Sequence, residues 1–132
     1  MDMNKFLTAL IAALLLTSCA MTANIPDSMS AAEIIQRGQE AMDNNNYKIA
    51  YQYYQALYDR NRTNTDLVIT AEYHIAFIHY KQGKLEQAKE ELNAVLAYYD
   101  SPDQELLPQH FKRLSQIVLE RIDEIEKKRF LF

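Results

Sequence analysis

The chain has 132 residues, of which 48% are hydrophobic and 24% charged, and its formal net charge is -4. This composition is that of one folded domain and excludes a wholly disordered chain, while the mild negative charge argues against nucleic-acid binding. Two glycines and three prolines are too few for the many tight turns of an all-β protein, so the composition predicts long helices with short connections.

Residues 1–18 follow the pattern of a lipoprotein signal peptide. Lys5 supplies the positive start, and the apolar run over residues 6–16 is shorter than the roughly 20 residues of a permanent membrane span. Residues 16–19 read Leu-Thr-Ser-Cys and resemble the bacterial lipobox. This resemblance implies cleavage before Cys19 and attachment of lipid to its thiol, so that acyl chains anchor the protein in a membrane.

The residues around Cys19 also predict where the protein is located. Cys19 is the single cysteine, so the chain cannot form an internal disulfide. Ala20 follows it in place of the aspartate typical of inner-membrane retention signals, which favours the outer membrane with the domain facing the periplasm. Residues 19–29 contain Pro26 and several small polar residues and are predicted to be a lipidated flexible tether. The alternative is a soluble secreted protein with a chance cysteine near its cleavage site.

From residue 30 onward the apolar residues recur at helical spacing. Ser30, followed by Glu33 three residues later, predicts a capping box at the start of the first helix. Five helices with short loops are expected to pack as antiparallel pairs. Pro108 lies in the first turns of the last helix or marks its true start. The predicted helices run to about residue 43 and then cover about 47–60, 66–81, 85–99 and 104–128.

The same spacing predicts which side chains of two helices face the core. Both helices carry apolar or aromatic residues at steps of three and four, which places them along one face. The predicted inward rows are Tyr47, Tyr51, Tyr54 and Tyr58 on the second helix and Leu107, Phe111, Leu114, Val118, Ile122 and Ile125 on the last.

Two of the helix pairs resemble units of the tetratricopeptide repeat (TPR) family. In the second pair, Ala76 and Ala88 stand at the small positions of the two helices, and Gly83 stands in the turn. In the first pair, Gly38 and Ala50 have the matching roles. Small residues suit these positions because paired helices cross closely there. The two pairs therefore look like successive repeats.

The match departs from the family pattern in places. Glu72 and Ile34 occupy the usual tryptophan position, and the longer loop at residues 61–65 separates the copies by more than the usual 34 residues. The resemblance implies an all-α, TPR-like α-solenoid over residues 30–132, made of two helix pairs plus a long C-terminal capping helix. The cap is expected because a repeat cannot bury its own apolar face. An unrelated helical bundle is the alternative.

No pattern in the sequence predicts catalysis or a metal site. His74 and His79 are five residues apart, so they point to different sides of one helix. The sequence contains no HExxH, CxxC or glycine-rich phosphate loop. The chain is therefore not expected to be an enzyme, nor to hold a metal or a cofactor.

The candidate binding site comes from the TPR resemblance. In that family, positions on the first helix of each pair line a concave groove in which partner peptides lie, and aromatic residues there offer large, rigid contact area. Lys81, beside Tyr80, is placed to meet a carboxylate. The alternative is that the last helix covers the aromatic residues, so that the chain fills its own groove. The predicted groove residues are Gln39, Met42, Tyr73, Phe77, Tyr80 and Lys81, with Asp43 beside them.

Together these features predict a lipid-anchored periplasmic TPR adaptor that binds a protein or peptide of the cell envelope. Residues 71–92 are similar to the TPR lipoprotein subunit of the outer-membrane β-barrel assembly machinery, which has more repeats; this similarity implies a related architecture and not the same role. Two alternatives remain. A ligand-binding TPR lipoprotein serving a transporter would have a deep enclosed cavity, and a self-assembling structural lipoprotein would be a homodimer that buries the aromatic groove.

Overall fold

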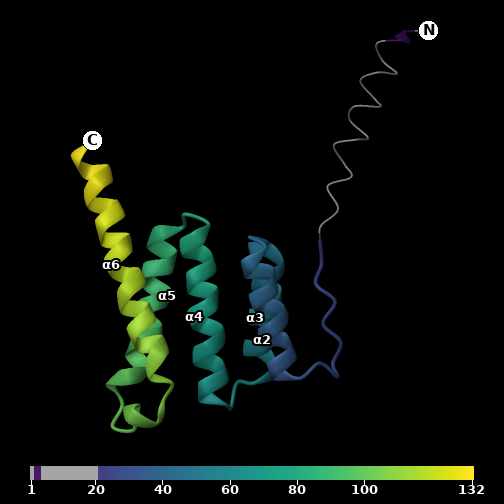
Figure 1. Cartoon of the computed structure of the whole chain (residues 1–132), viewed down its shortest axis with the longest axis horizontal. Coiled ribbons are helices and arrows are strands. Elements are labelled where there is room, and N and C mark those ends of the chain that lie inside the picture. Colours follow the sequence, from purple (N-terminus) through teal and green to yellow (C-terminus); the bar gives the residue numbers. More distant parts are fainter. Residues whose placement is uncertain (1, 4–20) are drawn as a thin grey trace.

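The computed structural model describes residues 2, 3 and 21–132, so Cys19 and nearly all of the predicted signal peptide lie outside the described residues. Within the described residues the chain is helical and contains no β-strand. The predicted fold of two helix pairs and a long last helix is confirmed (Figure 1). The helices are α2 (Ala31–Asp43), α3 (Tyr47–Arg60), α4 (Thr65–Lys81), α5 (Leu85–Ala97) and α6 (Gln109–Leu131).

Local side-chain hydrogen bonds set where the first three helices begin. The predicted capping box is present: the Ser30 hydroxyl accepts from the Glu33 amide, and the Glu33 carboxylate accepts from the Ser30 amide. The side chains of Asn46 and Asn64 accept in the same way at the starts of α3 and α4. After α4, Gly83 adopts a φ of 77°, a left-handed conformation that glycine adopts without strain.

The connection between α5 and α6 differs from the prediction. Helix α5 ends at Ala97, and two short 3-10 helices (Tyr98–Asp100 and Gln104–Leu106) follow it. Helix α6 begins at Gln109 with Pro108 as its N-cap, so the predicted start near residue 104 is wrong and the alternative reading of Pro108 holds. A proline disfavours helical backbone in the residue before it, which ends the preceding turn. The buried Tyr99 fastens this connection, because its hydroxyl donates to the Pro108 carbonyl at 2.7 Å.

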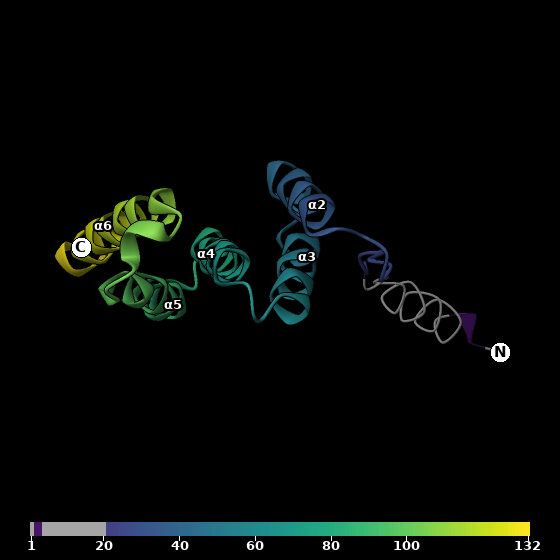
Figure 2. The same cartoon turned by 90° about the horizontal axis from the view of Figure 1, so that it is seen from below.

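Helix α4 is the centre of the domain. It lies between the α2–α3 pair on one side and α5 with α6 on the other (Figure 2). It contributes Ala71 and Ile78 to a core shared with α2 and α3, and Ile69, Tyr73 and Ala76 to a core shared with α5 and α6. The last helix therefore covers the α4–α5 pair, as predicted for a cap.

Two predicted core positions lie at the surface. Tyr51 is 37% exposed, and its hydroxyl donates along α3 to the Gln55 side chain. Leu114 is also 37% exposed, because the buried row of α6 runs one residue further on, through the buried Ser115. The apolar periodicity predicted the wrong inward residue here, because the inward position is occupied by a polar residue, Ser115.

The predicted flexible tether is held along α3 from residue 21 onward. The side chain of Gln52 accepts from the Ala23 amide at 2.7 Å and donates to the Met21 carbonyl at 3.2 Å. Further along, the Arg60 guanidinium donates to the Ile25 carbonyl at 2.8 Å. Ile25 and Met29 also pack on the core of α2 and α3. Composition had predicted flexibility, but side chains of α3 satisfy the backbone of this segment.

The close crossing of α2 and α3 yields a prediction at Gly38. A Cβ atom at this position would lie 2.8 Å from Cε2 of Tyr54, whose ring is buried and cannot move aside. Overpacking of this kind costs roughly 1–3 kcal/mol, while alanine gains about 1 kcal/mol in helix propensity over glycine. We expect Gly38→Ala to lower the free energy of unfolding by about 1 kcal/mol or more in urea denaturation.

The control is the same substitution in a Tyr54→Leu background. There the missing ring relieves the clash, so Gly38→Ala should cost less than in the wild-type chain. A stabilising effect of Gly38→Ala in the wild-type background would show that the two helices do not cross this closely.

Candidate functional site

The residues of the predicted concave groove are not brought together at one surface. Tyr73 is only 6% exposed, and its ring lies 5.1 Å from that of Phe111 on α6. Met42 is 9% exposed and belongs to the other core, with α2 and α3. Gln39 is exposed and donates to Asp43 on its own helix at 2.9 Å. Tyr73 and Met42 therefore serve as core residues, which corrects their assignment to an open groove.

The rest of the predicted set lies beside α6. Phe77 is half-buried and packs on both cores, and its ring lies 5.8 Å from that of Tyr80. Tyr80 and Lys81 line a surface cavity of about 250 Å³ together with Ile125 and Arg129 of α6. The alternative drawn from the sequence, in which the last helix covers the aromatic row, agrees with these contacts.

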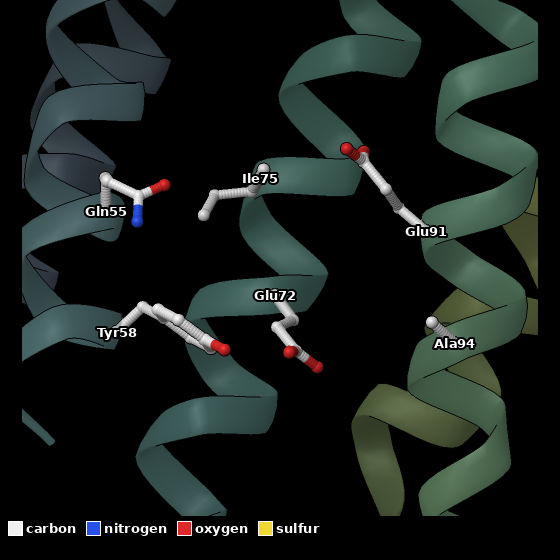
Figure 3. Close-up of a pocket in the computed structure, with 6 residues that line it drawn as sticks. All are labelled: Gln55, Tyr58, Glu72, Ile75, Glu91 and Ala94. Atoms are coloured by element: carbon white, nitrogen blue, oxygen red, sulfur yellow. The ribbon is translucent and has the colours of Figure 1, made fainter. Parts of the chain in front are cut away.

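A different groove opens between α3 and α5, with α4 as its floor. Its volume is about 220 Å³. Each of the three helices supplies two side chains spaced three residues apart, which places both on one face of that helix. Figure 3 shows these side chains around the same space: Gln55 and Tyr58 from α3, Glu72 and Ile75 from α4, and Glu91 and Ala94 from α5.

Hydrogen bonds order the α3 wall of this groove. Gln55 accepts from the Tyr51 hydroxyl at 3.1 Å and donates to the Asp59 carboxylate at 3.3 Å. The Arg62 guanidinium donates to the same carboxylate at 3.2 Å and lies 5.1 Å from the centre of the Tyr58 ring. The side chains of this wall are therefore held relative to one another by hydrogen bonds.

Glu72 gives the floor of the groove its charge. Burial raises the pKa of its carboxyl, and the hydrogen bond from the Tyr98 hydroxyl offsets part of that rise. The burial of Tyr98 and, after it, the contact with the Glu72 carboxylate raise the pKa of that phenol to about 12. Among the described residues, no lysine, arginine or histidine forms an ion pair with Glu72. Its carboxylate is half-buried without a counterion.

Glu91, on the opposite wall, is held in place by two partners. Nδ1 of His79 donates to one carboxylate oxygen at 2.6 Å, and Nε2 of Gln87 donates to the other at 3.1 Å. His79 is itself buried on α4, where its ring lies 5.8 Å from that of Tyr51. The groove therefore presents two oriented carboxylates beside the apolar side chains of Ile75 and Ala94.

The described residues contain neither a metal-binding cluster nor a membrane-spanning helix. In residues 2–3 and 21–132, no three His, Cys, Asp or Glu side chains are placed to hold a metal ion. Over the same residues, no helix is both long and apolar enough to cross a membrane.

The family model for the tetratricopeptide repeat matches residues 41–107. This chain belongs to the tetratricopeptide repeat family. The matched region covers half of the chain and contains every residue that lines the groove between α3 and α5. Members of this family typically bind other proteins and are not catalysts.

The chain is also similar to a protein of Treponema pallidum (strain Nichols) that is described only as uncharacterized. The two are 32% identical over 117 residues, which is 86% of this chain and 47% of that protein. The chain therefore spans about half the length of this relative. No solved structure matches the chain.

The sequence contains one signal for the groove between α3 and α5. Glu72 stands at the usual tryptophan position of the repeat, and the open space lies directly beside it. The pairs of lining residues, three positions apart on each of three successive helices, can also be read from the sequence. What the sequence does not contain is the separation of α3 from α5, because that depends on how both pack against α4.

The electrostatics of Glu72 lead to a prediction about stability. The pKa of Glu72 is raised in the folded chain, so the ionised carboxylate destabilises the fold at pH values above that pKa. This penalty disappears below the usual pKa of 4.5, where the carboxyl is protonated in both the folded and the unfolded chain. We expect Glu72→Gln to raise the free energy of unfolding at pH 7 by at most about 1 kcal/mol, since solvent screens a half-exposed charge. The gain should vanish near pH 4.

Denaturant titrations at both pH values measure this difference. Glu90→Gln is the matched control, because Glu90 is an exposed carboxylate on α5 and the substitution changes the net charge equally. Destabilisation by Glu72→Gln at pH 7 would mean that the carboxylate supports the fold instead of straining it.

Proposed function

We propose that this chain is a lipid-anchored TPR adaptor of the bacterial cell envelope and that it binds a protein partner in the groove between α3 and α5. The observation that carries the proposal is the groove itself, a pre-organised space walled by three helices of the matched repeat region. The partner would lie against Tyr58, Ile75 and Ala94, whose apolar surfaces lose water on binding. This face replaces the concave face predicted from the sequence.

The anchor is proposed from the lipobox-like residues that end in Cys19. The segment that follows Cys19 is held on the domain, because the Met21 carbonyl and the Ala23 amide are hydrogen-bonded to Gln52 of α3. A lipid on Cys19 would then lie only two residues from a fixed point of the domain. The groove would thus stay close to the membrane, proposed to be the outer membrane on its periplasmic side.

The groove's size favours an adaptor over the alternative of a ligand-binding lipoprotein that serves a transporter. Small-molecule pockets typically have volumes of roughly 300–1,000 Å³ and enclose most of the ligand. The groove between α3 and α5 has only about 220 Å³ and is open to the surface. Its shape suits a few side chains of a partner protein rather than a whole enclosed ligand.

Photo-crosslinking in living cells tests the site. We expect a photo-crosslinking amino acid with a compact alkyl-diazirine side chain at Ala94 to join the chain to another protein, because Ala94 is exposed and lines the groove and a side chain of that size does not fill it. Gln116, exposed on α6, is the matched control and should give little product. A third chain carries the photo-crosslinking amino acid at Gln39 and tests whether a partner binds on the concave side predicted from the sequence. In the same cells, Cys19→Ser should move the chain from the membrane fraction to the soluble fraction and weaken the Ala94 product.

The two parts of the proposal fail separately in this experiment. Absence of product from Ala94, or equal product from Gln116, would remove the groove as the binding site. A Cys19→Ser chain that stays in the membrane fraction after its signal peptide has been removed would rule out the lipid anchor. Product from Gln39 alone would restore the concave groove.

A further inference from the structure

The charges around the groove between α3 and α5 are unbalanced. Glu72 and Glu91 line it, and Asp59 is hydrogen-bonded to its Gln55 wall. Among the described residues, Arg62 is already paired with Asp59 and His79 with Glu91. The net potential in the groove is therefore negative, and it attracts a positively charged group.

Glu72 is the group that lacks a partner of opposite charge. Its carboxylate faces the groove, and the hydroxyl of Tyr98 is its one hydrogen-bond donor recorded in the described residues. A carboxylate partly removed from water is stabilised far more by a cation than by a neutral hydroxyl. The groove offers room for that cation, whereas residues 2–3 and 21–132 supply no ion-pair partner for Glu72 there.

The apolar residues define the shape of the missing group. Ile75 lies on the floor beside Glu72, and Ala94 and Tyr58 stand on the two walls. A long aliphatic stem can pack on such surfaces while its charged head reaches a carboxylate. Lysine and arginine have this combination, whereas an acidic or purely apolar side chain would leave Glu72 repelled or buried without a counterion.

Resting on the proposed function, we propose that the groove binds a partner-protein segment by taking up one of its lysine or arginine side chains. The methylene groups of that side chain lie along Ile75 and Ala94, and its charged head pairs with Glu72. Glu91 adds negative potential on the opposite wall. The partner is thus recognised through one basic residue, whose neighbours in the partner must be able to pack against the apolar surface of the groove.

A selection from a random dodecapeptide phage library tests this inference. The target is the full chain, purified in a mild detergent and immobilised. We expect enriched peptides to share a lysine or arginine. Synthetic copies should bind the wild-type chain at least about tenfold more tightly than they bind Glu72→Gln, because a desolvated charge pair is lost. Replacing the shared basic residue by methionine should weaken binding by a similar factor, and Glu90→Gln should leave it unchanged.

The outcomes separate the two proposals. Peptides that crosslink at Ala94 but lack a basic residue, or that bind Glu72→Gln as well as the wild-type chain, would overturn the inference and leave the adaptor standing. Failure to enrich any peptide would overturn both. Size-exclusion chromatography with light scattering examines one other source of a cation, the exposed basic residues 127–129 of a second copy. If the wild-type chain is a dimer and Glu72→Gln is a monomer, the basic side chain comes from a second copy, and the proposal of a different partner protein is overturned.

Discussion

The ring of Tyr54 is the contact on which the arrangement of the helices depends. It is fully buried, lies under Gly38 of α2, and stacks on His74 of α4 with ring centroids 4.3 Å apart. Burial lowers the pKa of His74, so the imidazole stays neutral at physiological pH and stacks without a desolvated charge. His74 in turn meets Phe111 of α6 at 5.7 Å. Aromatic contacts thus join the first pair, the central helix and the cap.

The groove follows from this arrangement. Because α3 is fixed on one side of α4 and α5 packs on the other, a single helix separates the two walls, and the space above it stays open. Glu72 lies in that space at the position where the repeat usually has a tryptophan. A residue that breaks a local rule and strains the free protein marks a functional position more often than a structural one. Loss of that strain on binding would favour partners that bring a cation.

Sequence reasoning predicted the elements well and the surfaces poorly. The cap at Ser30 and the turn at Gly83 depend only on neighbouring residues in the chain, so residue type alone was enough to predict them. The contacts of the tether could not be predicted, because they are made with Gln52 and Arg60, roughly 30 residues away in the chain. Tyr73 was assigned to a groove because the pattern cannot say that Phe111 covers it. The groove between α3 and α5 escaped prediction for the same reason, since its walls come from three helices.

Filling the groove tests the central claim most directly. Ala94→Trp places a large ring in the space beside Tyr58 and Ile75 without touching either core, so the thermal unfolding temperature should not fall. With a photo-crosslinking residue at Gln55, we expect the partner adduct to disappear in Ala94→Trp and to persist in the control Ala32→Trp, an exposed site on α2. An adduct of undiminished yield in a folded Ala94→Trp chain would show that the partner does not occupy this groove.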